Sequence, residues 1–244
     1  MRLRLQTDPQ KPPEFDQYAS LYSELLHDPI RNRFARDPLH FHRRKWYVLE
    51  RLLRKVGVTP GTKSWLDVGC GRGELLELAG GNFATASGCD PSAGMLSLNA
   101  SFKTFEQPSL SELPFEDHSV DLVTAVCVLH HVHGLDRTLL ADEIRRVLKP
   151  RGLCFIIEHN PWNPVTRTVV RRCPVDVDAE LLTAHQTRRL LERSGFIALK
   201  TEYFLYLPER VFDRFGAVER TFSKLPFGGQ YAFLARSPET RTSL

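Results

Sequence analysis

The chain of 244 residues is long enough for one α/β domain with an additional helical segment. Its 42% hydrophobic and 25% charged residues are ordinary for a globular protein and exclude a mostly disordered chain. No stretch approaches the roughly 18 consecutive apolar residues of a membrane-spanning helix, so we expect no membrane contact. The net charge of +4 is too small to argue for a nucleic-acid partner by itself.

The cysteines give no sign of a disulfide framework or a zinc site, because their number is odd and no C-x-x-C pair occurs. They are Cys70, Cys89, Cys127, Cys154 and Cys173. The first ten residues contain no apolar segment, so a secretory signal peptide is not expected. These features favour a cytoplasmic protein without a bound metal.

Helical patterns come first along the chain. Apolar or aromatic residues at 15, 18, 22, 25 and 26 form the stripe of an amphipathic helix over 15–26. A second helix is expected over 40–56, ending before Gly57. Everything before residue 12 reads as a frayed tail.

From residue 64 onward, short apolar runs alternate with helical patterns, which is typical of a parallel sheet with helical crossovers. We therefore expect a doubly wound α/β fold, with a mostly parallel seven-stranded sheet, helices on both faces and an antiparallel last strand. The expected strands are 64–68, 84–89, 102–105, 120–127, 153–158, 197–205 and 230–235. The expected helices are 73–80, 92–99, 136–148 and 179–194, with a loop or helix at 208–225.

A glycine-rich loop follows the first strand. Gly69, Gly71 and Gly73 stand at every second position between Val68 and the next helix. Glycines let a ligand approach the backbone, and the helix beyond supplies free N–H groups. The spacing fits neither the dinucleotide pattern G-x-G-x-x-G nor a P-loop. Asp67 would repel a phosphate and suits a cationic or hydroxyl-bearing ligand.

An acidic residue closes the second strand, 23 residues beyond Asp67. This residue, Asp90, is placed to accept hydrogen bonds from both hydroxyls of a ribose. It could also cap the helix that opens at Ser92, with Pro91 near the first helical position. The two roles are compatible.

These motifs resemble those of the class I, seven-stranded S-adenosylmethionine-dependent methyltransferases. The resemblance is specific from residue 64 to residue 152 and looser beyond. The matching runs are Leu66–Gly73, Gly88–Leu96, Leu113–Val132 and Glu143–Gly152.

The resemblance implies a role for each motif. The loop from Asp67 to Gly73 passes under the methionine part of the cofactor, and the strand end at 125–127 meets its ammonium group. The cofactor-binding residues expected in these two segments are Asp67, Gly69, Cys70, Gly71, Gly73, Ala125 and Cys127. Asp90 holds the ribose, and Pro91 or Met95 packs on the adenine.

One position departs from the family pattern. Many relatives carry an acid that contacts the adenine amino group four positions before the Leu-Pro-Phe run, and this chain has Ser109 there. A hydroxyl or a backbone group could substitute, so Ser109 and Leu110 are the residues expected at the adenine.

Relatives also suggest that residues 1–60 form a helical lid over a methyltransferase domain at 61–244, the two making one compact unit. Tyr18 would then reach the methionine end of the cofactor. The other interpretation is that Tyr18 and Tyr22, four apart on one helix face, merely pack that helix down.

Four side chains are candidates for removing a proton from the acceptor. His130 and His131 follow the fourth strand, at the edge where open α/β sheets bind ligands. Similarity to members with a His-Val pair favours His131 as the base, and only one of the two side chains is expected to face the cofactor. Glu158 and His159 form a second acid–base pair. Each candidate could instead pack or order a loop.

Two further features bear on the substrate. The run Asn160-Pro-Trp-Asn163 differs from the [DN]-P-P-[YFW] tetrad of amino-methylating nucleic-acid enzymes in place and in sequence. Residues 31–55 hold nine basic and two acidic residues, which favours a solvated helix face. Two alternatives remain for this segment. It could be a lid helix that meets an anionic acceptor, or it could bind an RNA substrate, although no RNA-binding motif accompanies it.

The sequence therefore predicts methyl transfer from S-adenosylmethionine to a small-molecule acceptor, an anionic one included, with a hydroxyl oxygen favoured over nitrogen or carbon. A bacterial subgroup with a similar Glu-His-Asn-Pro-x-Asn-Pro run and an N-terminal Phe-Asp-x-Tyr suggests natural-product or polysaccharide biosynthesis. The alternatives are an RNA methyltransferase and a fold-mate that binds the cofactor without transferring methyl. The oligomeric state stays open between monomer and homodimer.

Overall fold

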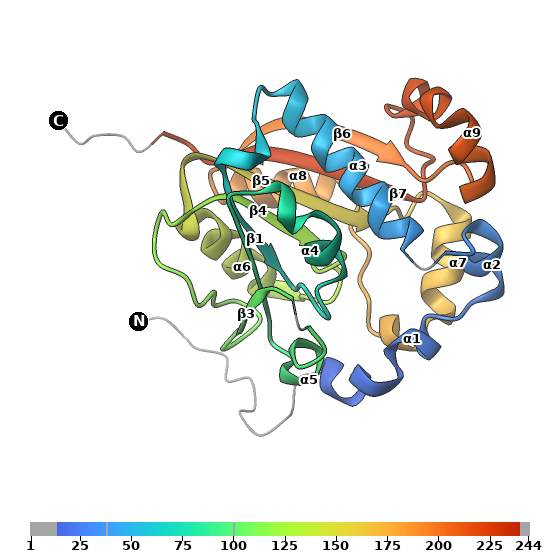
Figure 1. The fold of residues 1–244 in the computed structure, drawn as a ribbon, viewed down its shortest axis with the longest axis horizontal. Helices are drawn as coiled ribbons and strands as arrows, with labels where there is room; N and C mark the ends of the chain where they lie inside the picture. Colours follow the sequence, from blue (N-terminus) through green and yellow to red (C-terminus); the bar gives the residue numbers. More distant parts are fainter. Residues whose placement is uncertain (1–13, 38, 100, 240–244) are drawn as a thin grey trace.

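The computed structural model describes residues 14–37, 39–99 and 101–239. Its centre is a seven-stranded sheet in the order β3-β2-β1-β4-β5-β7-β6, in which only β7 runs antiparallel to its neighbours (Figure 1). The strands are β1 (Ser64–Val68), β2 (Thr85–Asp90), β3 (Lys103–Glu106), β4 (Val120–Val126), β5 (Leu148–His159), β6 (Ile197–Phe204) and β7 (Gln230–Arg236). The expected fold class is confirmed.

Helices cover both faces of the sheet. On one face lie α3 (His40–Lys55) and α4 (Glu74–Ala79), and on the other α6 (Gly134–Val147) and α8 (Ala184–Arg193) (Figure 1). α3 buries Val48, Leu49 and Leu52, the i, i+1, i+4 spacing of one helix face. The central strands are covered on both sides, which is why they read as nearly continuous apolar runs.

The strand order places the site. It reverses between β1 and β4, where Val68 and Ala125 stand side by side in register. Open α/β sheets bind ligands in the crevice at such a reversal, beyond the carboxyl ends of the strands. The glycine-rich loop and both histidine motifs lie at this edge.

Two segments differ from the sequence-based expectation, and a third, which was left open, is now decided. The stripe over 15–26 is not one helix but η1 (Glu14–Gln17), η2 (Ala19–Leu21) and α1 (Tyr22–Leu25). A helix not expected from the sequence, α7 (Pro164–Arg172), starts with Pro164 at its first position and with an Asn163 cap. The open choice at 208–225 resolves into α9 (Glu209–Glu219) and η6 (Arg220–Phe222). The remaining elements are α2 (Pro29–Phe34), η3 (Pro60–Thr62), η4 (Gly80–Asn82), α5 (Ala93–Leu96) and η5 (Pro174–Asp176).

The division at residue 60 stays a prediction, and α3 is the part of the N-terminal segment that contributes to the core. In the described part of the chain, no helix has the length and apolar character needed to cross a membrane.

Candidate functional site

The loop between β1 and α4 turns on three glycines with left-handed backbone angles. Gly69, Gly71 and Gly73 have φ values of 67°, 54° and 78°. The N–H groups of Gly69 and Cys70 donate to the Cys89 carbonyl at 2.8 and 3.0 Å, which ties the loop to the end of β2. The loop is therefore a fixed part of the carboxyl edge.

The three glycines are required for different reasons. A Cβ at Gly69 would lie 2.5 Å from the Val128 side chain, and one at Gly73 would meet another side chain at 2.2 Å. At Gly71, the nearest heavy atom among the described residues is Met95 Cε, at an ordinary 3.6 Å. Packing within the protein thus demands the outer two, whereas the middle one leaves a cradle that a side chain would fill.

Asp90 joins this loop to the next one. Its Oδ2 accepts from the Gly71 N–H and its Oδ1 from the Ser92 N–H, both at 2.9 Å. Ser92 itself caps α5, accepting from the Met95 N–H at 3.1 Å, so the predicted helix cap belongs to Ser92. Burial raises the pKa of Asp90. Each carboxylate oxygen keeps acceptor capacity for a ligand hydroxyl, and Pro91 lies half-buried beside it.

The residues predicted at the adenine lie beside the end of β2. The Gln107 N–H donates to the Asp90 carbonyl at 2.9 Å, and Gln107 Nε2 donates to the Ser109 carbonyl at 2.7 Å. Leu110 is exposed next to them. The structure thus brings Ser109 and Leu110 to the edge that carries Asp90, and their contact with adenine stays a prediction.

Asp67 is buried rather than exposed to the crevice. Its Oδ1 accepts from the Thr124 hydroxyl, which in turn accepts from Trp65 Nε1 at 2.8 Å. Burial raises the pKa of Asp67 to about 7, although the Thr124 hydrogen bond and the Lys45 ammonium act in the opposite direction. Its carboxylate is therefore an internal charge on the α3 face of the sheet.

Lys45 of α3 is a residue that the sequence interpretation missed. It is buried, and its ammonium is close enough to Asp67 and Cys127 to lower the pKa of both groups. A buried cation beside a glycine loop suits the carboxylate of a bound methionine group. Its spacing in the sequence could have revealed it, because Lys45 lies three and four residues before Val48 and Leu49, on the buried face of the helix. The basic neighbours were all assigned to the solvated face.

The end of β4 completes this wall of the crevice. Ala125 lies beside Val68, and Cys127 follows with a left-handed φ of 59°. Burial acts to raise the pKa of the Cys127 thiol, but Lys45 and His159 outweigh burial and lower it to about 7. Both predicted strand-end residues therefore lie at the carboxyl edge.

We call the loops at 69–73 and 90–95, together with Lys45 and Asp67, the glycine side, and the turn at 127–131 with Glu158 and Asp176 the histidine side. On the histidine side, buried His130 lies 2.5 Å from Glu158, between Nδ1 and Oε2. Glu158 Oε1 also accepts from the N–H groups of residues 128 and 129, at 3.0 and 2.7 Å. Burial acts to lower the pKa of His130, but Glu158 and Asp176 raise it to about 10. Burial acts to raise the pKa of Glu158, and His130 lowers it overall.

Asp176 of η5 is the second residue that the sequence interpretation missed. Its Oδ1 lies 3.4 Å from His131 Nε2 and 3.7 Å from His130 Nε2. Burial acts to raise the pKa of Asp176, but the two histidines hold it well below its usual range. Nothing in its local sequence marks it, because it meets the histidines only through the fold.

Two details of the predicted proton machinery were wrong. Glu158 binds His130 and does not orient His159, because successive residues on a strand point to opposite faces. The side chains of His130 and His131 both lie against Asp176, although we expected the two to face different ways and only one to face the cofactor. The reason is a tight turn, closed by the His131 N–H on the residue 128 carbonyl at 3.0 Å.

The Asn-Pro-Trp-Asn run orders the chain beyond β5. Asn160 Nδ2 donates to the carbonyls at 226 and 228, at 2.9 and 2.8 Å, and Asn163 Nδ2 donates to the carbonyl at 227 at 2.7 Å. Trp162 is 66% exposed. The asparagines thus serve the loop before β7, which accounts for this motif without a role in nucleic-acid methylation.

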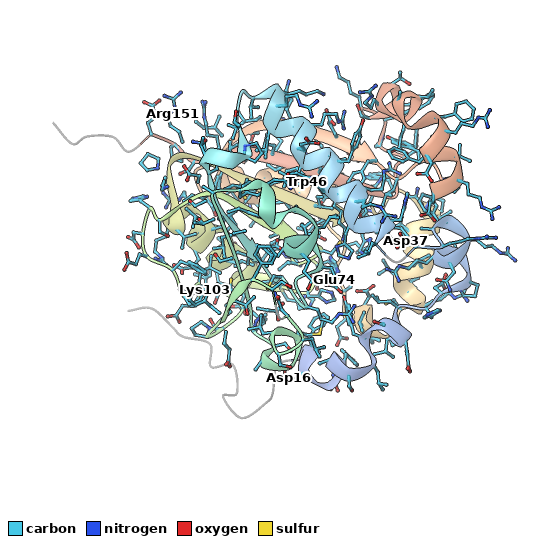
Figure 2. All side chains as sticks on the ribbon, in the orientation of Figure 1. Asp16, Asp37, Trp46, Glu74, Lys103 and Arg151 are labelled. Carbon is cyan, nitrogen blue, oxygen red and sulfur yellow. The ribbon has the colours of Figure 1, made fainter. Side chains whose placement is uncertain are left out.

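Residues 14–25, which we call the N-terminal strap, contact both sides of the site. Asp16 Oδ1 accepts from the Ser92 hydroxyl at 2.5 Å and from the Gly94 N–H at 2.9 Å, and Figure 2 shows it beside α5. Phe15 meets the His131 ring edge-on, at 4.9 Å between centroids. The Phe-Asp pair of the N-terminal motif therefore bridges the glycine side and the histidine side.

The rest of the strap is held near the glycine loop. Arg72 Nη1 donates to the Ser23 hydroxyl at 2.8 Å, and its guanidinium lies over the Tyr22 ring. Tyr18 is half-buried against Phe15, with 6.2 Å between ring centroids. This contact fits the packing interpretation, and the polar contact of Tyr18 with a cofactor stays a prediction.

Part of the basic charge of 31–55 is paired with carboxylates of the protein itself. Arg44 forms a buried ion pair with Glu219, and Arg51 and Lys55 share Glu202 of β6. These pairs fix α3 to β6 and α9 and leave less charge for an anionic partner.

The residues of the glycine side fit S-adenosylmethionine. The cradle at Gly71 would admit the methionine part, Lys45 offers a cation for its carboxylate, and Asp90 keeps acceptor capacity for a ribose. A pyrophosphate in the same place would lie beside Asp90, which carries the wrong charge for it.

Comparison with known proteins agrees with this geometry. Residues 66–156 match the family described as "Methyltransferase domain". The chain is 36% identical over 127 residues to a demethylmenaquinone methyltransferase of Staphylococcus aureus, covering 48% of this chain and 51% of the relative. It therefore spans about half the length of the curated relatives that it matches.

Solved structures share the fold at low sequence identity. The methyltransferase bound to the Haloferax volcanii Trm112 methyltransferase activator superposes with a TM-score of 0.65, at 17% identity, covering 93% of this chain and 98% of that one. The cyclase SpnF gives 0.56 at 20% identity, with 79% and 81% covered. These likenesses concern the fold alone.

Proposed function

Because this chain carries a methyltransferase domain of the class I, seven-stranded type, we propose that it transfers a methyl group from S-adenosylmethionine to a small-molecule acceptor, with a hydroxyl oxygen favoured over nitrogen or carbon. The cradle at Gly71 is the observation that carries this proposal. It opens at the strand reversal, where the glycine side and the histidine side meet. S-adenosylhomocysteine is the second product.

The cofactor would lie along the glycine side. Its methionine part would pass over Gly71, with its carboxylate toward Lys45 and its ammonium toward the strand end at 125–127. The ribose hydroxyls would bind Asp90, and the adenine would lie between Met95 and the loop at 109–110. Two observations support this placement: each Asp90 oxygen accepts only one hydrogen bond from the protein, and the space at Gly71 is open.

Methyl transfer is an in-line displacement in which the protein aligns donor and acceptor and removes a proton. The acceptor oxygen forms the new bond to the methyl carbon, the carbon–sulfur bond breaks, and its electron pair goes to sulfur. We assign the acceptor proton to His131, which is partly exposed beside Asp176. We rank His159 second as a candidate base, ahead of His130, because His130 is already bound to Glu158.

A substitution at His131 tests this chemistry. Labelled cofactor and a panel of phenols, sugars and carboxylic acids, analysed by mass spectrometry, identify the acceptor. Demethylmenaquinone belongs in the panel because of the similarity to the staphylococcal enzyme. His131→Asn is then expected to lower kcat by about 10²–10⁴-fold, the usual contribution of a general base, with unchanged affinity for S-adenosylhomocysteine.

The control is His133→Asn, which removes an exposed histidine paired with Glu180 at 3.4 Å. A kcat within about threefold of the parent for His131→Asn and for His159→Asn contradicts proton removal by histidine. The acceptor would then be an amine or carbon nucleophile that needs alignment only.

Two other functions predict different results. A fold-mate of the cyclase kind would bind S-adenosylhomocysteine but methylate no member of the panel. An RNA methyltransferase would bind RNA with steep salt dependence. The ion pairs of Arg44, Arg51 and Lys55 favour the small-molecule proposal, which suits natural-product or polysaccharide biosynthesis.

A further inference from the structure

Three potential metal ligands converge on the histidine side. One ligand atom from each of His130, His131 and Asp176 lies within 4.8 Å of the other two. The separations from Asp176 Oδ1, 3.7 and 3.4 Å, exceed the roughly 2.9 Å of a normal N–H···O hydrogen bond. Donors bound at about 2.1 Å to one ion lie roughly 3 to 3.5 Å apart, so small side-chain movements would close the set around an ion.

The surroundings hold these donors in a ligating orientation. Glu158 engages Nδ1 of His130, which directs Nε2 toward Asp176. Histidines that bind metals commonly donate their other ring N–H to a carboxylate, which fixes the tautomer and strengthens the ligand. Glu158 is itself fixed by the backbone N–H groups of residues 128 and 129, so the whole arrangement is built in advance.

We propose that His130, His131 and Asp176 bind a divalent first-row transition-metal ion. Two imidazoles and one carboxylate suit Zn²⁺, Mn²⁺ or Fe²⁺, whereas Mg²⁺ and Ca²⁺ prefer all-oxygen sites. The Glu158 and Asp176 carboxylates balance the charge of the ion. Three protein ligands leave coordination positions open for another molecule.

The use of the site, but not the binding of the ion, rests on the proposed function. The cluster follows β4 directly, three residues beyond Cys127, on the side proposed for the acceptor. There the ion would hold an acceptor with two adjacent oxygens, such as a diol or a hydroxy acid, in line with the methyl group. With the ion bound, His131 would be a ligand and not the base, and the hydroxyl would release its proton to water; His131 would act as the base only in the metal-free protein.

Titration of the metal-stripped full chain with Co²⁺ tests the binding. The titration is followed by calorimetry and visible absorption at several pH values above neutral, because the ion must displace the proton that the neighbouring carboxylates favour on His130. We expect one ion per chain, without the intense near-ultraviolet band of a thiolate ligand. The affinity should fall at least tenfold in Asp176→Asn and in His131→Asn, and should be unchanged in His133→Asn.

Three results would overturn the site: no binding at millimolar Co²⁺, binding that survives both substitutions, or an equal loss in His133→Asn. The affinity of each variant for S-adenosylhomocysteine reports whether it is folded. A parent that binds Co²⁺ but not S-adenosylhomocysteine refutes the proposed function and leaves the metal site standing, and the reverse result refutes the metal site alone.

Discussion

The glycine side and the histidine side lie at the same edge of the sheet but are built in opposite ways. The glycine side consists mainly of backbone: two consecutive turns, with left-handed glycines and one carboxylate that joins Gly71 to Ser92. The histidine side consists of side chains, and its carboxylates come from Glu158 and Asp176, far along the chain. One region offers a shaped space, and the other offers ionisable groups.

The contrast explains which groups are free for a ligand. On the glycine side the backbone is fixed by hydrogen bonds within the protein, and a ligand would use the space at Gly71 and the spare acceptor capacity of Asp90. On the histidine side the groups are close together and electrostatically coupled, so one substitution there is expected to disturb several groups. The predictions below test this difference, from the largest expected effect to the smallest.

Removal of the internal charge at Asp67 should give the largest effect on stability. Burial raises the pKa of Asp67 from 3.8 to about 7 in the folded protein. Between these pH values the folded state holds a proton that the unfolded chain has lost, so the Asp67 contribution to the unfolding free energy decreases as pH rises. The Asp67→Asn side chain does not titrate in this range. The unfolding free energy of the variant minus that of the parent should therefore increase by up to about 4 kcal/mol between pH 4 and pH 8.

Urea unfolding of parent and variant at several pH values measures this gap, with Asp178→Asn at an exposed position as the control. A gap that stays constant with pH would show that folding does not raise the pKa of Asp67, which would contradict the desolvation of this carboxyl group described above.

Filling the cradle should give the largest effect on cofactor binding. Gly71→Ala is expected to weaken S-adenosylhomocysteine about a hundredfold, equivalent to about 2.7 kcal/mol, in calorimetry. Gly57→Ala is a matched control, because Gly57 has a φ of 72° and no described heavy atom within 4 Å of its Cβ position. Equal losses in the two variants would mean that backbone strain, and not the space at Gly71, is responsible.

Loss of the buried ammonium should have a smaller effect. Lys45→Met keeps most of the side-chain volume and removes the charge, so affinity for S-adenosylhomocysteine should fall about tenfold through one lost charge-assisted hydrogen bond. Arg54→Met on the same helix, at a side chain 73% exposed, should leave the affinity unchanged. If the Lys45→Met variant binds as tightly as the parent, the Lys45 ammonium does not contribute to cofactor binding.

The N-terminal strap should give the smallest effect. Asp16→Asn weakens the hydrogen bonds to Ser92 and Gly94, so we expect S-adenosylhomocysteine to dissociate about threefold faster in stopped-flow measurements. An unchanged dissociation rate would indicate that the strap does not close over the glycine side.

The positions of the glycine loop and Asp90 at the sheet edge could be predicted from the sequence, because the information for them is local; their contact with a cofactor stays a prediction. A strand, three glycines, a helix and then Asp90 follow one another within about 30 residues, as a strand–helix–strand unit requires. The strand boundaries were also readable, since buried parallel strands are short apolar runs. Ser92 as the true helix cap needed the side-chain geometry, because Asp90 and Ser92 are both good caps.

The histidine side was only half predictable. His130, His131 and Glu158 were identified by their places after β4 and at the end of β5, but their partners were not. Asp176 lies 45 residues beyond His131 in a short 3₁₀ turn, and only the path of the chain through α7 brings it back. Charged side chains that meet through tertiary structure leave no spacing in the sequence.

Binding of S-adenosylhomocysteine to the unmodified chain is the most direct test of the central claim, that the glycine side is a site for this cofactor. Calorimetry is expected to show one site per chain with micromolar or tighter affinity, and no competition from NADH. An absence of binding at millimolar S-adenosylhomocysteine, or equal binding of NADH, would contradict the assignment.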